Sequence, residues 1–209
     1  MAQAGTRATD SPRTSKGIER EQQILAIAEN LFHKRGYAQT SVGDIAEATG
    51  LLKGSLYYYM ESKEDLLYRI VSEVHEVSHQ QLADALKDTG TPALERLVDF
   101  THAQLLYNAE HHTRVAVYHH EWRRLEGARL KDVRSRRQEY DQELASLIAQ
   151  VRDEGGLPAD VDLRLVANNI LAVVCWPYTW YRPADLTPRA LADFGAAFVR
   201  SALSGLSAT

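Results

Sequence analysis

The sequence has a single cysteine and no hydrophobic run long enough to cross a membrane. With Cys175 alone, no disulfide can form within the chain of 209 residues. Its apolar neighbours indicate a buried, inert thiol rather than a redox sensor. The longest apolar runs, such as residues 170–177, fall well short of a bilayer span, and the N-terminus has no apolar signal core. These absences predict a cytoplasmic protein.

Excess positive charge, which is common in nucleic-acid-binding proteins, is also missing. The formal net charge is −4 at pH 7, and residues 1–62 hold equal numbers of basic and acidic side chains. Any case for DNA binding must therefore rest on the pattern of residues and not on bulk charge.

Strand patterns are absent as well, since no segment shows sustained alternation between turn residues. Apolar residues instead recur at helical spacing in about nine segments, which predicts an all-α fold. The hydrophobic content of 44% is ordinary for a globular protein that buries a sizeable core. The expected helices cover residues 18–34, 42–49, a short stretch from residue 53, 63–87, 91–111, 113–125, 128–153, a stretch after residue 162 and 189–206.

Residues 41–63 form the most informative stretch of the chain. Ser41 and Asp44 have the spacing of a capping box, so a helix is expected to begin after Ser41. Gly50 can take the left-handed conformation that ends this helix. A second, short helix of about two turns is expected from Lys53. Helix, glycine turn and short helix are typical of a helix-turn-helix, whose second helix enters a DNA major groove by its N-terminal end.

The motifs T-S-V-x-x-I-A-x-x-x-G at residues 40–50 and K-G-S-L-Y-Y-Y-M-x-S-K-E-x-L-L at residues 53–67 resemble the DNA-binding signature of TetR-family transcriptional repressors. The chain departs from that signature at Leu52, where a small polar residue is common, and at Met60, where Phe is usual. Met60 is a core substitution of similar volume. The resemblance implies phosphate contacts, whereas Lys53, Gly54 and Ser55 occupy the groove-facing end of the short helix. The residues expected at phosphates are Ser41, Tyr57, Tyr58 and Lys63.

The resemblance also implies a domain organisation. We expect a disordered arm at residues 1–17, a three-helix DNA-binding domain at 18–62, and an effector-binding and dimerisation domain at 63–209. A homodimer would place its two recognition helices on a palindromic operator. The long helix at 63–87 would connect the two domains.

A second cluster of aromatic residues lies near the C-terminus, where Pro177 is expected to kink a helix. Together with residues 121–137, this stretch resembles the ligand domain of acyl-CoA-responsive TetR-family repressors of fatty-acid and steroid catabolism. The resemblance implies an acyl-CoA effector, with a drug, a free fatty acid or a polyketide-like metabolite as alternatives. The expected ligand-binding residues are Tyr118, Trp122, Arg123, Asn169, Trp176 and Trp180, although the two last tryptophans can equally fill a core. The candidates for the CoA phosphates are Arg129, Lys131, Arg134, Arg136 and Arg137, which can equally form a solvated helix face.

The last predicted helix presents a broad face of apolar and small residues. A face this wide on a terminal helix indicates a partner, which for an isologous dimer is a second copy of the chain. The residues expected at this interface are Leu191, Phe194, Ala197 and Phe198.

Two histidine patterns raise other functions. His75-Glu76-x-x-His79 matches the helical zinc-hydrolase motif, but no third ligand is indicated downstream, so surface histidines are expected instead. The pairs at residues 111–112 and 119–120 could serve a metal sensor, although such pairs are usually solvated. We therefore expect no catalytic residue, no cofactor and no metal site.

Overall fold

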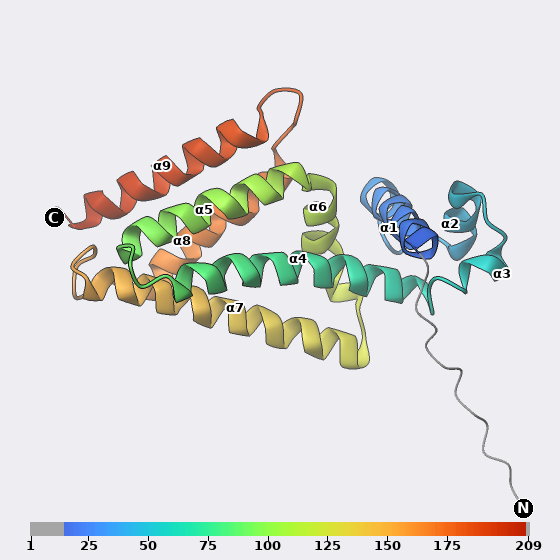
Figure 1. Ribbon diagram of the computed structural model, residues 1–209, viewed down its shortest axis with the longest axis horizontal. Helices are drawn as coiled ribbons and strands as arrows, with labels where there is room; N and C mark the ends of the chain where they lie inside the picture. The colour runs from blue at the N-terminus through green and yellow to red at the C-terminus, as the bar shows by residue number, and fades with distance from the viewer. Residues whose placement is uncertain (1–14, 208–209) are drawn as a thin grey trace, which may run out of the picture.

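The computed structural model describes residues 15–207, and within this range it contains helices, turns and loops but no strand (Figure 1). The predicted all-α fold is confirmed. The α-helices are α1 (Ser15–Arg35), α2 (Val42–Thr49), α3 (Lys53–Leu56), α4 (Lys63–Lys87), α5 (Ala93–Glu110), α6 (His112–Glu121), α7 (Gly127–Asp153), α8 (Leu163–Cys175) and α9 (Pro188–Ser207). Two 3₁₀ helices, η1 (Trp122–Arg124) and η2 (Trp176–Thr179), follow α6 and α8.

The helices are arranged along one long axis. Figure 1 shows α1, α2 and α3 gathered at one end of the molecule and the C-terminal end of α9 at the other. Helix α4 begins beside the first group and runs along α7, while α9 lies against α5. Helix α6 packs against both α1 and α4. None of the helices in residues 15–207 combines the length and apolar character that a membrane span requires.

The chain begins its helical structure earlier than the sequence predicted. Helix α1 starts at Ser15, so residues 15–17, which were expected in the disordered arm, are helical; residues 1–14 of the expected arm lie outside the described range. Buried positions at 24, 25, 28 and 32 give α1 one apolar face, because they repeat at helical spacing. Gly36, with φ of 82°, ends the helix in the left-handed conformation.

Two large hydrophobic cores hold most of the helices together, and a small third cluster joins α9 to the end of α5. The first combines α1–α4 with α6 and the start of α7, including Leu56, Leu66 and Trp122. The second is built from the far half of α4, α5, the end of α7, α8 and α9. Each fully buried Leu, Ile or Phe side chain stabilises such a core by about 1.5–3 kcal/mol. The first core runs without a break across residue 62, so the DNA-binding helices rest directly on the following helices.

The C-terminal aromatic segment differs from its prediction. Pro177 does not kink a continuing helix: α8 ends at Cys175 and η2 follows, with Pro177 buried in its first turn. The missing proline N–H removes an α-helical hydrogen bond, and the tighter 3₁₀ turn takes its place. Cys175 is half-buried where the sequence predicted a buried thiol, and desolvation raises the pKa of the thiol to about 11, which favours the protonated form over the reactive thiolate.

Candidate DNA-binding surface and ligand cavity

Helix α2 is fixed by the capping box that the sequence predicted. The Ser41 hydroxyl accepts a hydrogen bond from the Asp44 amide at 3.1 Å, and the Asp44 carboxylate accepts one from the Ser41 amide at 2.7 Å. The Ser41 hydroxyl also donates to the Asp44 carboxylate at 2.6 Å, and this hydrogen bond, together with that from the Ser41 amide, holds the pKa of Asp44 below its usual value. Gly50 ends the helix with φ of 67°, as predicted.

Helix α3 is shorter than predicted, with one α-helical turn at Lys53–Leu56. The chain then continues in tighter turns, because the amides of Tyr58 and Tyr59 bond to carbonyls three residues back. Leu56 and Met60 are buried and anchor the segment in the first core, which confirms Met60 as a core residue. Tyr57 and Tyr58 are exposed by 49% and 76%.

The beginning of α3 presents an open surface. Lys53, Gly54 and Ser55 are all exposed, and Leu52 before them is 80% exposed. A Cβ atom added at Gly54 would meet no atom of the described chain within 4 Å, and φ at this position is not positive. Neither packing nor backbone conformation therefore requires glycine at position 54. The surface lets another molecule approach the backbone closely there.

Lys63 lies at the start of α4, and its ammonium is bound inside the protein. Nζ donates to the carbonyls of Tyr37 and Thr40, both at 2.8 Å, and lies 4.1 Å from the centre of the Tyr37 ring. Partial burial lowers the pKa of the ammonium. Lys63 thus fixes the loop before Ser41, and only one of its three N–H donors remains for the predicted phosphate contact.

Polar contacts connect helix α6 to the DNA-binding helices. Arg114 donates to Glu29 of α1 at 2.8 Å and to Glu73 of α4 at 2.5 Å. At the other end of α6, the Glu121 carboxylate accepts from the Tyr37 amide at 3.1 Å. Helix α6 is therefore tied to α1, to α4 and to the loop that precedes α2.

Two arginines proposed for CoA phosphates are already paired with carboxylates. Arg129 contacts Glu61, Glu64 and Asp65 at 3.2–3.4 Å. Arg136 lies 3.0 Å from a carboxylate one turn earlier on α7. Arg129 therefore joins α7 to the start of α4, and its guanidinium is compensated within the chain.

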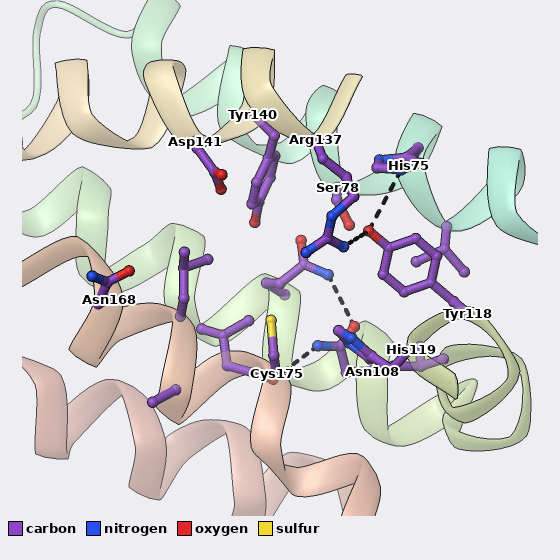
Figure 2. Close-up of a pocket in the computed structure, with 16 residues that line it drawn as sticks. His75, Ser78, Asn108, Tyr118, His119, Arg137, Tyr140, Asp141, Asn168 and Cys175 are labelled. Carbon is purple, nitrogen blue, oxygen red and sulfur yellow. Dashed lines mark hydrogen bonds between the residues drawn. The ribbon is translucent and has the colours of Figure 1, made fainter. Parts of the chain in front are cut away.

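An internal cavity of about 310 Å³ lies between α4, α5, α6, α7 and α8 (Figure 2). It opens to solvent between α7 and α8, where Asp141, Asn168 and Ala172 are exposed. The lining combines aliphatic side chains with a band of polar groups. The lining residues are Val74, His75, Ser78, Gln104, Asn108, Val115, Tyr118, His119, Arg137, Tyr140, Asp141, Asn168, Leu171, Ala172, Val174 and Cys175.

Arg137, Tyr118 and His75 form one polar wall of the cavity. Arg137 Nη1 donates to the Tyr118 hydroxyl at 2.5 Å, and that hydroxyl lies 3.5 Å from His75 Nε2, as Figure 2 shows. Burial raises the pKa of Tyr118 to about 12, so it stays protonated. Burial, together with His79 and Arg137, lowers the pKa of His75 to about 3, so its ring is neutral and Nε2 can accept a hydrogen bond from the Tyr118 hydroxyl.

Gln104 and Asn108 of α5 form a second polar wall. Asn108 Nδ2 donates to the Val174 carbonyl at 3.0 Å, and Gln104 Nε2 donates to Asn108 Oδ1 at 3.0 Å. Both side chains are buried, and within residues 15–207 the buried Gln104 Oε1 has no hydrogen-bond partner. This oxygen is an unused acceptor in a side chain that lines the cavity.

The surface position expected for His75 is wrong. His75 is 4% exposed, because it extends the buried row of Leu67 and Val71 at intervals of four residues along α4. His79 is half-buried and bonds to Glu143 and to the carbonyl of Arg136. Within the described residues, no three His, Cys, Asp or Glu side chains are placed to hold a metal ion.

Of the six residues predicted to bind a ligand, Tyr118 lines the cavity and the other five do not. Trp122 packs in the first core with Arg123 stacked on its ring at 4.5 Å. Asn169 bonds to a carbonyl of its own helix. Trp176 and Trp180 are exposed because α8 ends just before them, which directs both rings away from the cavity.

Trp176 and Trp180 instead belong to an exposed apolar surface on α8, η2 and α9. Leu191, predicted for the dimer interface, is not part of it, since it is buried against Ala109 and Tyr181 of the same chain. Gly195 packs against α5 of the same chain. The other predicted interface residues, Phe194, Ala197 and Phe198, are exposed. We call this the α8–α9 surface, and its large apolar members are Leu165, Trp176, Trp180, Phe194, Phe198 and Leu206.

Sequence reasoning missed His75, Gln104 and Asn108 as cavity residues, although a signal was present. Gln104 and Asn108 follow the buried Leu97 and Thr101 at intervals of three and four residues, so they share the buried face of α5. Polar side chains at such positions are candidates for a cavity lining.

Comparisons with known proteins agree with this architecture. Residues 24–70 match the model of bacterial regulatory proteins of the tetR family, and residues 90–204 match a tetracyclin repressor-like C-terminal domain. The transcriptional repressor KstR2 of Mycolicibacterium smegmatis is 27% identical over 96% of both chains. KstR2 of Rhodococcus jostii is 32% identical over 81% of this chain and 83% of its own.

Two solved structures are similar over most of the chain. The ketosteroid transcriptional regulator KstR2 of Mycobacterium tuberculosis has a TM-score of 0.81 at 27% identity, covering 90% of this chain and 94% of its own. AibR in complex with isovaleryl coenzyme A and operator DNA has a TM-score of 0.74 at 28% identity, covering 86% and 97%. From the helix-turn-helix to the C-terminal helices, this chain belongs to the TetR family of bacterial regulatory proteins.

Proposed function

We propose that this protein is a transcriptional repressor that binds a palindromic operator as a homodimer and releases it when an acyl-CoA thioester enters the cavity. One observation carries the proposal. Helix α4 begins at Lys63, beside the exposed α3, and twelve residues later contributes His75 to the cavity wall. A ligand that moves α4 therefore moves the DNA-binding surface.

DNA binding is supported by the exposed start of α3. Lys53 and Ser55 carry hydrogen-bond donors, and Gly54 leaves room for a phosphate backbone or a base edge. Tyr57 and Tyr58 extend the same surface, together with Ser41 at the start of α2. We therefore keep these residues in the DNA-binding set and give Lys63 chiefly a positioning role.

Homodimerisation is supported by the α8–α9 surface. Phe194 is 72% exposed and Trp176 is 62% exposed, which is costly for large apolar side chains unless a partner covers them. A two-fold dimer would place two α3 helices in successive major grooves, about 34 Å apart. Trp176 and Trp180 thus change from predicted ligand residues to proposed interface residues.

An acyl-CoA effector is supported by the size and the opening of the cavity. At about 30 Å³ per water-sized group, a volume of about 310 Å³ holds roughly ten non-hydrogen atoms. That space suits an acyl group, whereas the CoA portion would lie outside the opening between α7 and α8. Arg134 is exposed and lies two helical turns before Asp141 on the same face of α7, so we propose it for a phosphate contact. AibR was solved with isovaleryl coenzyme A bound.

Release from DNA requires that the effector binds the two conformations of the protein with different affinities. The cavity lies against α4 through His75 and against α6 through Tyr118. Both helices are tied to α1 through Arg114. Filling the cavity would thus change the separation of the two α3 helices in a dimer and lower the affinity for the operator. By thermodynamic linkage, bound operator would lower the affinity for the effector by the same factor.

DNA binding is tested with genomic fragments that the purified protein enriches. Tyr57→Phe removes only an exposed hydroxyl, so we expect operator affinity to fall about five-fold to ten-fold in an anisotropy titration. Tyr59→Phe, in a half-buried tyrosine two residues away, serves as the matched control. Equal affinity of the Tyr57 variant and the wild type would contradict the proposed surface.

The dimer and the effector need separate measurements. Phe198→Asp is expected to give a monomer in analytical ultracentrifugation, whereas Leu52→Asp, at another exposed apolar site far from the α8–α9 surface, should stay dimeric. Octanoyl-CoA should release the operator, whereas coenzyme A alone and octanoic acid should not. A monomeric wild type, or release by octanoic acid as strong as by the thioester, would refute the corresponding part of the proposal.

A further inference from the structure

The polar groups of the cavity restrict the chemistry of the molecule that fills it. The Gln104 oxygen is already buried without a partner in the described residues, so a plain hydrocarbon chain would leave it unpaired. A molecule that pairs with this oxygen and with the free Arg137 donors would gain hydrogen bonds and should bind more tightly than the hydrocarbon chain. The hydrogen-bonding groups of the lining therefore favour one chemical class of acyl group over others.

The direction of the Gln104 amide is fixed by its neighbours. A backbone carbonyl can only accept, so Asn108 must present Nδ2 to the Val174 carbonyl and Oδ1 to Gln104. Gln104 must then present Nε2 to Asn108 Oδ1, which leaves Oε1 as the free end of this chain of hydrogen bonds. The wall formed by Gln104 and Asn108, which we call the α5 wall, consequently offers a hydrogen-bond acceptor and requires a donor from the ligand.

The wall formed by Arg137, Tyr118 and His75, which we call the α7 wall, has hydrogen-bond donors instead of a free acceptor. Arg137 donates from Nη1 to the Tyr118 hydroxyl, and that hydroxyl can donate a hydrogen bond to the neutral His75 ring. An arginine has five N–H donors, so the guanidinium keeps donors beyond this contact. Figure 2 shows Arg137 extending from α7 toward Tyr118, across the cavity from Asn108 and Cys175. This wall offers donors and requires an acceptor.

We infer that the effector is a hydroxylated acyl group, whose hydroxyl donates to Gln104 Oε1 and can accept from Arg137. Ketones and carboxylates only accept, so they leave Gln104 unpaired. An ammonium only donates, and the positive charge of Arg137 opposes it. A hydroxyl performs both roles. The inference rests on the proposed function, since it names the acyl class for the same cavity, and it makes Gln104 the residue that distinguishes hydroxylated from plain chains.

The test compares octanoyl-CoA with its 3-, 5-, 7- and 8-hydroxy derivatives by calorimetry on the full chain. Octanoyl has about the number of atoms that the cavity holds. At least one hydroxylated ester is expected to bind the wild type about ten-fold or more tightly than octanoyl-CoA. A bound water bridging the two walls would make all five esters bind alike, and that result would overturn the inference.

Variants identify the residue responsible. Gln104→Met keeps the side-chain length but removes the acceptor, so the preference for the hydroxyl should disappear. In its protonated form, which burial favours, the side chain of Gln104→Glu donates to Asn108 Oδ1 and keeps an acceptor oxygen, so this variant should retain the preference and separates recognition from damage to the fold. Gln81→Met is the matched control, because Gln81 Oε1 is also buried and unpaired in the described chain but lies outside the cavity. A hydroxyl preference that survives in Gln104→Met would overturn the role of Gln104.

Failure of the acyl-CoA assignment has a different signature. If none of the esters binds, the assignment of the thioester is wrong, and octanoic acid and its hydroxy derivatives then repeat the comparison for the cavity alone. Tighter binding of a hydroxy acid, lost in Gln104→Met, would support the inference, and equal binding of all the acids would overturn it.

Discussion

His75 is expected to make the stability of the protein depend on pH. Its pKa is about 3 in the folded protein, mainly because of burial, against an ordinary value of 6.5. Above pH 6.5 the ring is neutral in both the folded and the unfolded state. Below pH 6.5 the unfolded chain binds a proton that the folded protein does not, so the free energy of unfolding decreases as the pH falls.

The magnitude follows from the size of the pKa difference. Each pH unit between the unfolded and the folded pKa removes about 1.4 kcal/mol, so lowering the pH from 6.5 to 5 costs about 2 kcal/mol through His75. The replacement His75→Gln cannot be protonated in this range. Its free energy of unfolding should therefore decrease by about 2 kcal/mol less than that of the wild type over the same interval.

Urea unfolding followed by circular dichroism at pH 7 and pH 5 measures this difference. Equal protein concentrations are needed because a dimer is stabilised by association. Burial lowers the pKa of His119 to about 4, but His119 is present in both proteins and its contribution cancels. His111→Gln, at an exposed histidine, should behave like the wild type. If His75→Gln and the wild type lose the same free energy, His75 is not buried as a neutral ring.

Two further predictions concern stability and are checked by thermal unfolding. Ser41→Ala removes the hydroxyl that caps α2 and should lower the free energy of unfolding by about 1 kcal/mol, whereas Ser41→Gly should lower it by a few tenths of a kcal/mol. Equal losses in the two variants would show that the cap contributes little. Arg114→Gln leaves the carboxylates of Glu29 and Glu73 without their partner and should cost about 1–3 kcal/mol. As a control, Arg164→Gln breaks an exposed ion pair and should change the free energy of unfolding by less than about 0.5 kcal/mol. An equal loss in Arg114→Gln and Arg164→Gln would contradict the importance of the Arg114 contacts.

Features that depend on near neighbours in the chain were predictable. The capping box at Ser41, the left-handed Gly50 and the start of α4 at Lys63 are set by residues within one or two helical turns. Periodicity likewise predicted the helices, because each buries one face against a core. The helix-turn-helix was therefore recognisable from a short stretch of sequence.

The cavity lining was less predictable because it depends on helix phase. One residue rotates a helix by about 100°, so the exact end of α8 decides whether an aromatic ring faces the cavity or the solvent. With α8 ending at Cys175, Trp176 points outward. Aromatic character alone could not distinguish these directions, and it drew attention away from the polar Gln104.

Contacts between distant residues were not visible in the sequence either. Arg129 forms part of a basic run on α7, which the sequence allowed as either a phosphate site or a solvated face. The structure pairs it with Glu61, Glu64 and Asp65, more than sixty residues earlier. Only the fold determines which members of a charged run are neutralised within the chain.

The Arg114 contacts also limit how regulators of this kind can be recombined. A chimera that replaces residues 1–62 with the corresponding segment of a relative keeps Arg114 and Glu73 but exchanges Glu29 and Tyr37. A donor segment without a carboxylate at the position of Glu29 would break the junction with α6, even if each half were well folded. Compatibility of the exchanged halves is thus decided at α6, and engineered sensors should carry matching partners for this helix.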